Sequence, residues 1–265
     1  MADLFFPQMS SGALAQYPIK KALLARTIKN VLPDGSMITL ADSLGARLVW
    51  QMTYIELSTL DIEALQSHFS ACMGPYRAFT FIDPTDNMFN FSSDLTATAW
   101  DRSSLISVLP GQSDPEGGTA AFTVVNQGQA SQIIGQTLNV PANYQYCFSV
   151  YAQADQAGEL TLVRNGISPG ESTIATIGPA WTRIISSGRL NDAGTSFTAG
   201  ISVAPGQQVR LYGPQLEAQI APSRYRVTAD TGGVYPNSHW GVEELEVSAD
   251  APNLFSTTFS IETAR

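Results

Sequence analysis

The chain is poor in cysteine, histidine and lysine, and each shortage excludes a class of protein. Its two cysteines, Cys72 and Cys147, lie far apart in apolar segments, so we expect buried free thiols and not a disulfide framework. Two histidines, His68 and His239, are too few to complete a zinc site with these cysteines. All three lysines lie within the first 29 residues, and the formal net charge is −9. Because a phosphate-backbone binder needs a dense cationic surface, nucleic acid is not an expected partner.

Charge and long apolar runs are also scarce. Only 14% of the 265 residues are charged, against roughly 25% in an average soluble chain. The hydrophobic content of 44% nevertheless excludes a disordered protein. Residues 117–154 carry no charge, but polar side chains interrupt them throughout, so we expect no membrane insertion. Residues 1–19 lack a basic segment followed by an apolar run, which predicts no secretory signal and synthesis in a cytoplasm.

Glycine, proline and small polar residues fill the space that charge leaves. The 21 Gly and 15 Pro favour many short strands joined by turns. Pro33-Asp34-Gly35 separates the β-rich runs 27–31 and 37–40, and this turn chemistry predicts a hairpin. Further strands are expected at 48–57 and 78–82.

One helix is expected between Ser58 and Gly74. Ser58 can cap it, with Asp61 in the first turn. Apolar residues recur at helical spacing along one stripe, namely Ile62, Leu65, Phe69 and Cys72. Gly74-Pro75 then ends the helix.

The composition changes after residue 88. Between 89 and 236 short alternating runs recur without a helical pattern, at 121–125, 132–138, 146–152, 158–164, 181–186, 196–203 and 208–212. Such spacing predicts an antiparallel β-sandwich of the jelly-roll type. Apolar groups on both faces of 146–152 indicate a central strand. Two last strands, at 242–247 and 254–261, are too few to fold alone.

The expected fold is therefore mainly β, with a second domain inserted in the first. Residues 1–88 and 237–265 together form an α+β domain with one helix. Residues 89–236 form the inserted antiparallel jelly roll, which is possible where the ends of the inserted domain lie close together.

The first domain resembles the distal tail protein family of long-tailed phages. The residues that match are Arg47-Leu-Val-Trp50, Tyr54, Gly74, Phe79-Thr-Phe-Ile-Asp83-Pro84 and Asn87, with a helix before the glycine. The resemblance implies a β-sandwich tail-tip domain that forms a ring, with a hexamer expected, between the tail tube and the baseplate hub. It also implies that the sheet and hairpin make subunit contacts.

The inserted domain resembles carbohydrate-binding jelly-roll modules. The matching residues are 95–100, Gly117-Gly-Thr-Ala, Tyr146-Cys-Phe-Ser-Val-Tyr151, Trp181-Thr-Arg183, Leu211-Tyr-Gly-Pro-Gln-Leu-Glu217 and Pro222-Ser-Arg-Tyr225. This resemblance implies binding of host cell-surface glycans.

Glycan binding needs exposed aromatic rings together with polar groups. The candidates in the inserted domain are Tyr144, Tyr146, Tyr212, Tyr225 and Glu217. Glu217 binds either Arg183 or a sugar hydroxyl in this interpretation. Trp100 and Trp181 match positions that pack in the core of such modules.

No pattern of residues predicts catalysis. GxSxG, HExxH, P-loop and GxGxxG motifs are absent from the sequence. His68 is interpreted as a solvated or capping residue of the helix, and His239 as a loop contact. A glycosidase needs only two carboxylates, so a polysaccharide-cleaving enzyme remains an alternative, although no acidic pair stands out.

A structural Ca²⁺ is a minor alternative for the jelly roll, since such an ion needs six or more oxygen ligands. Asp94, Asp114 and Glu116 are possible donors, but their spacing does not single them out. No cofactor and no metal site are predicted.

Charged residues at the two ends of the chain are candidate oligomer contacts. Glu243, Glu244 and Glu246 form one acidic run. In a ring they can meet Lys20, Lys21 and Arg26 of a neighbouring subunit.

The sequence thus predicts a virion structural protein at a phage tail tip, with an outward module for weak, repeated glycan contacts. The main alternative is a receptor-binding or fibre-attachment adhesin that acts through glycan binding. A module that serves only as a spacer is a further possibility.

Overall fold

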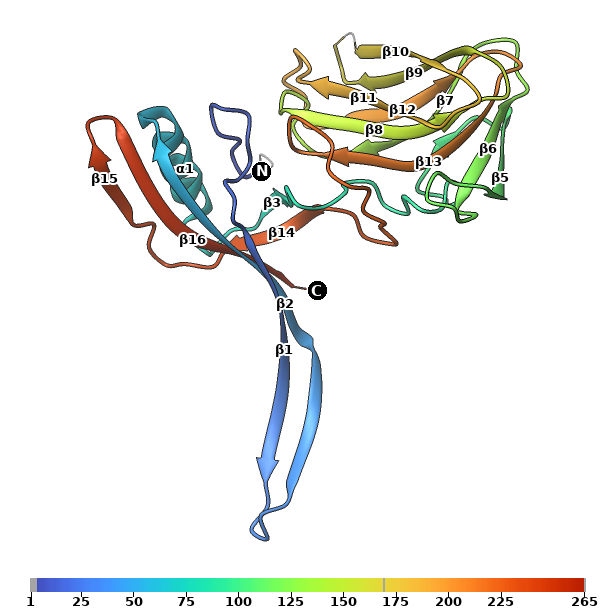
Figure 1. Ribbon diagram of the computed structural model, residues 1–265. Coiled ribbons are helices and arrows are strands. Elements are labelled where there is room, and N and C mark those ends of the chain that lie inside the picture. The colour runs from blue at the N-terminus through green and yellow to red at the C-terminus, as the bar shows by residue number, and fades with distance from the viewer. Residues whose placement is uncertain (1–3, 169, 265) are drawn as a thin grey trace. The chain divides into compact units, whose positions relative to one another are not determined.

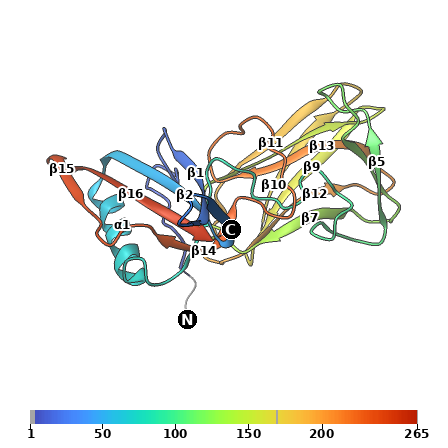
Figure 2. The ribbon, with the colours of Figure 1, turned by 90° about the horizontal axis from the view of Figure 1, so that it is seen from below.

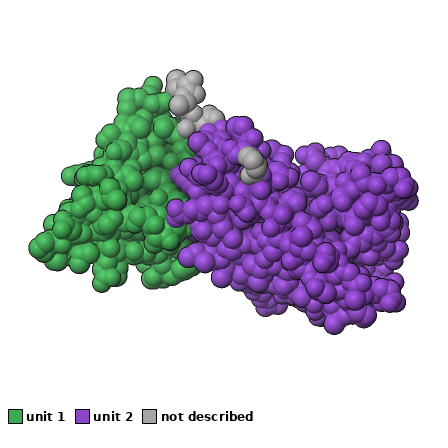
Figure 3. Space-filling model, turned by 90° about the horizontal axis from the view of Figure 1, so that it is seen from above, with its two compact units in different colours: residues 1–81, 235–265 green, residues 82–234 purple. Residues whose placement is uncertain are grey.

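The computed structural model describes residues 4–168 and 170–264 (Figure 1). The chain divides into two compact units, which are coloured in Figure 3. Unit 1 comprises residues 1–81 and 235–265, and unit 2 comprises residues 82–234. The sequence predicts these divisions at 88/89 and 236/237. The fold is mainly β, with antiparallel sheets and a helix in unit 1.

Unit 1 is built on a six-stranded sheet with the strand order β1-β2-β16-β14-β3, and β15 pairs with β16. The strands are β1 (Lys20–Val31), β2 (Met37–Leu57), β3 (Phe79–Ile82), β14 (Val234–Trp240), β15 (Val247–Ala251) and β16 (Leu254–Ala264). The long central strands β2 and β16 are paired from Leu57↔Phe255 to Arg47↔Ala264.

The predicted hairpin is confirmed as β1 and β2. At its turn Asp34 Oδ1 accepts hydrogen bonds from the backbone N–H and the hydroxyl of Ser36, at 2.9 and 2.7 Å. Gly35 adopts φ +83°, which an L side chain rarely takes. The strands are far longer than predicted, because the turn chemistry marks only the end of a hairpin. All twelve residues of β1 are exposed, so its sequence shows no alternation of buried apolar and exposed polar positions.

The predicted helix is also confirmed, as α1 (Thr59–Cys72). Ser58 and Asp61 form a reciprocal capping box, in which each side chain accepts from the other's backbone N–H. The helix ends in two left-handed residues, Met73 at φ 55° and Gly74 at φ 62°. No helix of the described chain combines the length and the apolar character that crossing a membrane requires.

Helix α1 packs against one face of the unit 1 sheet (Figure 2). His68 lies in this interface, with its ring centroid 4.7 Å from Phe79, 5.7 Å from Trp240 and 5.8 Å from Phe6. The interpretation of His68 as a solvated or capping residue is therefore wrong. An aromatic cluster draws the imidazole into the core, where it also lies 3.7 Å from the Sγ of buried Cys72.

The strand predicted at 242–247 is also wrong. β14 and β15 lie one after the other along the same edge of β16, with Trp240 opposite Ile261 and Val247 opposite Thr257. Residues 241–246 therefore lie beside only three residues of β16. Six residues are too many to stay paired over that length, so they form a loop. Their alternation of apolar and acidic residues imitates a strand.

Unit 2 is a sandwich of two five-stranded antiparallel sheets, with the orders β10-β9-β12-β7-β4 and β11-β8-β13-β6-β5. The strands of the first sheet are β4 (Asp101–Arg102), β7 (Gln132–Leu138), β9 (Gly158–Asn165), β10 (Glu171–Ile177) and β12 (Phe197–Val203). Those of the second are β5 (Ile106–Gln112), β6 (Ala121–Asn126), β8 (Tyr146–Gln153), β11 (Thr182–Gly188) and β13 (Gln208–Glu217). The jelly-roll β-sandwich expected for this part of the chain is consistent with these sheets.

The core of unit 2 lies between the two sheets. β8 is a central strand, as predicted, because it pairs with β11 on one side and β13 on the other. Trp100 is buried against Phe89, at 5.0 Å between centroids, and its Nε1 donates to Phe91 O. Trp181 is only half-buried.

Candidate functional site

Two of the tyrosines predicted to bind glycan lie near the start of β8. Tyr146 has no exposed surface, and its hydroxyl donates to Pro141 O at 2.8 Å while its ring packs on Phe197. The structure therefore leaves Tyr146 no ring face for a sugar. Tyr144 is half-buried in the turn before β8.

The other two tyrosines come together on the second sheet. The ring of Tyr212 lies 5.3 Å from that of Tyr225 and 6.0 Å from that of Tyr151. Burial raises the pKa of Tyr212 and of Tyr225 to about 12. The guanidinium of Arg183 lies over the Tyr151 ring at 5.2 Å, and the Tyr225 hydroxyl contacts Ser92 Oγ. These rings mostly cover one another, so this cluster offers little open ring surface.

Glu217 does not bind Arg183. Its buried carboxylate accepts from the hydroxyl of Ser223 at 2.5 Å and from the side-chain amides of Gln215 and Gln219, both at 2.7 Å. Arg183 instead donates to Ser223 O at 2.7 Å. Glu217 and Arg183 therefore fix the same segment, around Ser223, against the sheet.

An open pocket whose lining residues are mostly polar, called the polar pocket below, lies elsewhere in unit 2, at the ends of β8 and β13. Its volume is about 340 Å³. Lining residues come from the end of β8, the β8–β9 turn, the β12–β13 turn and the start of β13: Gln153, Ala154, Asp155, Gln156, Ala157, Gly158, Gln207, Gln208 and Arg210. None of these residues is predicted from the sequence, because they lie in two separate turns and the strand ends beside them and form no motif.

Arg210 is the central polar group of this pocket. Its guanidinium donates to Gln153 Oε1 at 3.1 Å and to Asp155 Oδ1 at 2.8 Å. Gln153 is itself held by a bond from its Nε2 to Pro179 O at 2.6 Å. The Asp155 carboxylate and the Gln208 side chain are exposed. The pocket thus combines pre-positioned donors and acceptors with little net charge.

The polar pocket continues onto the face that carries the tyrosines. Gln153 lies opposite Arg210 in the β8–β13 ladder. Tyr151 lies opposite Tyr212, two residues further along each strand. Residues two apart in a strand share a face. A ligand in the pocket can therefore extend toward the half-buried ring of Tyr151.

The three possible Ca²⁺ donors are used locally or exposed. Asp114 accepts backbone N–H bonds from Glu116, Gly118 and Ala120, each at 2.9 Å, and these bonds lower the pKa of its carboxyl. Asp94 binds Thr96. Among the described residues, acidic, His and Cys side chains form no cluster of three that could hold a metal ion.

In unit 1 the outstanding surface is the hairpin, which extends beyond the other strands of its sheet (Figure 1). Large apolar side chains are exposed along it: Leu23, Leu24, Ile28, Val31, Leu32, Met37, Ile38, Leu40 and Leu44. A soluble monomer rarely exposes a large contiguous apolar patch. This surface is therefore a candidate protein contact.

The charged candidates for oligomer contacts are all in unit 1. Arg26 forms an ion pair with Asp42 inside the hairpin, and Lys21 Nζ lies 5.6 Å from the centroid of the Trp50 ring. Lys20 is exposed on the same strand. Glu243, Glu244 and Glu246 are exposed in the loop between β14 and β15.

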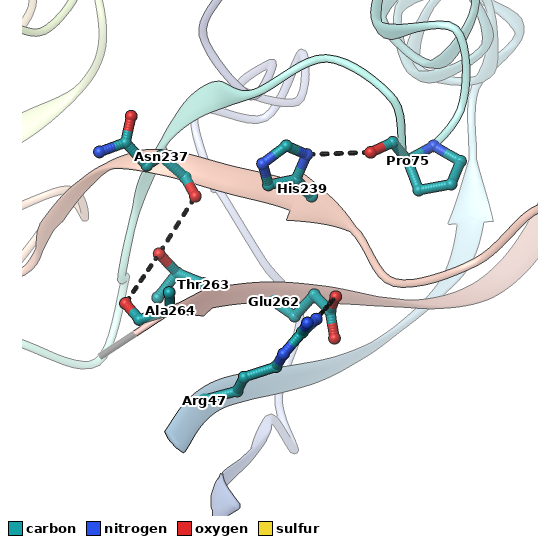
Figure 4. Close-up of polar contacts among 7 residues, drawn as sticks. All are labelled: Arg47, Pro75, Asn237, His239, Glu262, Thr263 and Ala264. Carbon is teal, nitrogen blue, oxygen red and sulfur yellow. Dashed lines mark hydrogen bonds and ion pairs between the residues drawn. The ribbon is translucent and has the colours of Figure 1, made fainter. Parts of the chain in front are cut away.

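The base of the hairpin is tied to the sheet. Arg47 of β2 forms an ion pair with Glu262 of β16 (Figure 4). On the neighbouring strand β14, His239 Nδ1 lies 2.9 Å from Pro75 O, where the chain leaves α1. His239 is thus a strand residue with a loop partner.

Several solved structures are similar to the structure of this chain. No protein-family model and no curated protein matches the sequence. The family 22 carbohydrate-binding module of Clostridium thermocellum Xyn10B is similar at a TM-score of 0.41 and 17% identity, over 52% of this chain and 94% of that one. The xylan-binding domain CBM22-1 of Paenibacillus barcinonensis Xyn10C is similar at a TM-score of 0.41 and 13% identity, over 53% of this chain and 97% of that one. The enzymatically active domain of tailspike protein 4 from bacteriophage CBA120 is similar at a TM-score of 0.40 and 10% identity, over 52% of this chain and 22% of that one.

Proposed function

We propose that the chain is a phage receptor-binding adhesin whose unit 2 binds host surface glycans. The observation on which this rests is the polar pocket around Arg210, which lies beside a half-buried tyrosine. The resemblance of the inserted domain to carbohydrate-binding jelly rolls supports the ligand class. The resemblance of residues 1–88 to phage tail-tip proteins supports a place in a phage particle.

The chemistry of the pocket suits a sugar. Neighbouring hydroxyl groups need both donors and acceptors, and Gln153, Asp155, Gln208 and Arg210 supply both. A volume of about 340 Å³ equals roughly eleven waters at ~30 Å³ each. A hexose has twelve non-hydrogen atoms, and covalently bonded atoms take up less space than separate waters, so one sugar ring fits. Tyr151 can contact a neighbouring ring through its exposed part.

A glycan array with the full-length chain, followed by titration with the best oligosaccharide, tests this proposal. We expect Asp155→Ala and Gln208→Ala each to weaken binding about tenfold, since each removes a hydrogen bond to the ligand. Asp101→Ala and Gln112→Ala are matched controls outside the pocket and retain binding. No glycan bound, or equal losses in the controls, would contradict the proposal. A reducing-end assay on the same mixtures tests the enzyme alternative.

A second candidate function, ring assembly at a phage tail tip, is favoured by the exposed apolar hairpin of unit 1. Tail tube and baseplate hub proteins are its expected partners. The particle mass by light scattering, with negative-stain images, tests it. A closed ring of about six copies supports this role, which the resemblance implies. Glu244→Lys should loosen such a ring if the acidic loop contacts cations of a neighbour, and an unchanged oligomer contradicts that contact.

A further inference from the structure

The polar pocket contains two opposite charges that compensate one another. Of its nine lining residues, one is acidic, Asp155, one is basic, Arg210, and four are glutamines. The two charged side chains form an ion pair at 2.8 Å, and they are 65% and 29% exposed. A ligand therefore meets neutral amide groups and an ion pair without net charge.

Arg210 is held at both of its terminal nitrogens. Nη1 donates to Gln153 Oε1 at 3.1 Å, and Nη2 donates to Asp155 Oδ1 at 2.8 Å. Gln153 is fixed in turn, because its Nε2 donates to Pro179 O at 2.6 Å. A guanidinium has five N–H groups, so Arg210 can also donate to a ligand while its pair with Asp155 stays intact.

An uncharged sugar can bind without disturbing this ion pair. A hydroxyl group accepts from one neighbour and donates to another, so it suits a guanidinium and a carboxylate that lie side by side. The exposed side chains of Gln156 and Gln208 offer further donors and acceptors among the lining residues. Hydrogen bonds to charged groups are stronger than those between neutral groups, so Arg210 and Asp155 can make the main contacts with the sugar.

An acidic sugar loses binding energy in either of two ways. If the ion pair stays intact, the carboxylate or sulfate of the sugar lies near the Asp155 carboxylate, and like charges repel. If the sugar displaces Asp155 from Arg210, one ion pair replaces another, and Asp155 stays nearby without its partner. The exposed Glu159, which follows the lining residue Gly158, adds a further negative charge to this part of the chain.

We propose that Asp155 determines the charge specificity of the polar pocket: it occupies Arg210 and thereby restricts the pocket to uncharged sugars. This inference deepens the glycan-binding function proposed above and rests on it. Specificity arises from repulsion of the wrong ligand as well as from attraction of the right one. Without the Asp155 charge, Arg210 becomes a binding group for carboxylates, which guanidinium groups bind through two parallel hydrogen bonds.

The glycan array gives the first result when it carries neutral and acidic sugars side by side. We expect the sugars that bind the full-length chain to be uncharged. Binding confined to sugars with carboxylate or sulfate groups, or equal binding to both classes, overturns the charge specificity and leaves glycan binding standing. An array without any bound sugar overturns both.

The variant Asp155→Asn removes the charge and keeps the shape of the side chain. The probes are trisaccharides of glucose, galactose and mannose, each as the neutral sugar and as the uronate in which the CH2OH groups are oxidised to carboxylates. We expect Asp155→Asn to bind the uronates at least about tenfold more tightly than the parent chain does, measured by calorimetric titration. Asp101→Asn is the matched control, because Asp101 is exposed in unit 2 and lies outside the pocket. It should bind like the parent chain.

A double variant and a salt series show whether the gain comes from Arg210. Asp155→Asn/Arg210→Gln should lose the uronate binding that Asp155→Asn gains. That gain should also disappear at about 1 M salt, where the Debye length is about 3 Å. Circular dichroism checks that each variant is folded. If a folded Asp155→Asn gains no uronate binding, or if the gain persists without Arg210, the charge specificity assigned to Asp155 is wrong, whatever the array shows for glycan binding itself.

Discussion

At the scale of single residues, the buried imidazole of His68 links the stability of unit 1 to pH. Burial lowers the pKa of His68 from 6.5 to about 4. Below pH 6.5 the unfolded chain takes up a proton here and the folded chain does not. The free energy of unfolding should therefore fall as the pH drops from about 6.5 to about 4. At ~1.4 kcal/mol per pKa unit, the loss is about 3 kcal/mol.

Urea unfolding between pH 7 and pH 4, followed by tryptophan fluorescence, measures this loss. Replacement of the imidazole in His68→Leu should remove most of the pH dependence in this window, whatever it does to the stability at pH 7. His239→Leu is the matched control, because His239 is only partly buried and bonds to Pro75 O. If His68→Leu retains the full slope, another group is responsible.

A pair of glycines makes the first sheet of unit 2 intolerant of even a methyl group. Gly135 of β7 lies opposite Gly200 of β12. A Cβ at Gly135 would lie 2.6 Å from Ala199 O and 2.8 Å from the Cα of Gly200, both of them backbone atoms. We expect Gly135→Ala to lower the melting temperature, at a cost of about 1–3 kcal/mol. Gly178→Ala meets no atom within 4 Å and should be nearly neutral.

At the scale of elements, the capping box of α1 determines where the helix begins. Ser58 Oγ accepts from the Asp61 N–H, and Asp61 Oδ2 accepts from the Ser58 N–H, both at 3.2 Å. Ser58→Ala should destabilise unit 1 by about 1 kcal/mol in chemical unfolding. Ser70→Ala, an exposed change near the end of the same helix, should be neutral or slightly stabilising. Equal losses in the two variants would contradict the capping role.

Elements specified by local chemistry could be predicted from the sequence. The turn at Asp34-Gly35 and the cap at Ser58 each involve a few neighbouring residues, so the hairpin and the helix are readable. The sequence pattern does not show strands β5 and β10, because they lie at sheet edges with largely exposed side chains. The prediction at 242–247 fails because β14 and β15 pair with the same edge of β16, and the alternation of apolar and polar residues carries no information about that tertiary pairing.

The candidate site was less predictable than the fold. The sequence singles out aromatic residues, but only the sheet register places Tyr146 in the core and Tyr212 beside Tyr225. The pocket joins Gln153 to Arg210, 57 residues apart, through their pairing in the β8–β13 ladder. Amide and charged side chains in turns look like solvated loop residues until a structure brings them together.

At the scale of the whole molecule, glycan binding and ring assembly make one joint prediction. If copies assemble into a ring, several glycan pockets belong to one particle. Binding to a dense glycan surface is then multivalent, and avidity can exceed single-site affinity by about 10²–10⁴ where the linked sites engage together. The double variant Ile28→Thr/Leu40→Thr removes two exposed apolar side chains that lie opposite one another in the β1–β2 hairpin. If the hairpin makes the assembly contact, this variant should lose most of that gain on immobilised polysaccharide.

Free oligosaccharide separates avidity from affinity, because each soluble ligand occupies one pocket. Titrated with it, Ile28→Thr/Leu40→Thr should bind like the parent chain, since both residues belong to unit 1 and the pocket to unit 2. Asp155→Ala should show the reverse pattern, with weakened binding to free ligand and an unchanged particle mass. If Ile28→Thr/Leu40→Thr binds the surface as tightly as the parent chain, adhesion does not depend on assembly through the hairpin.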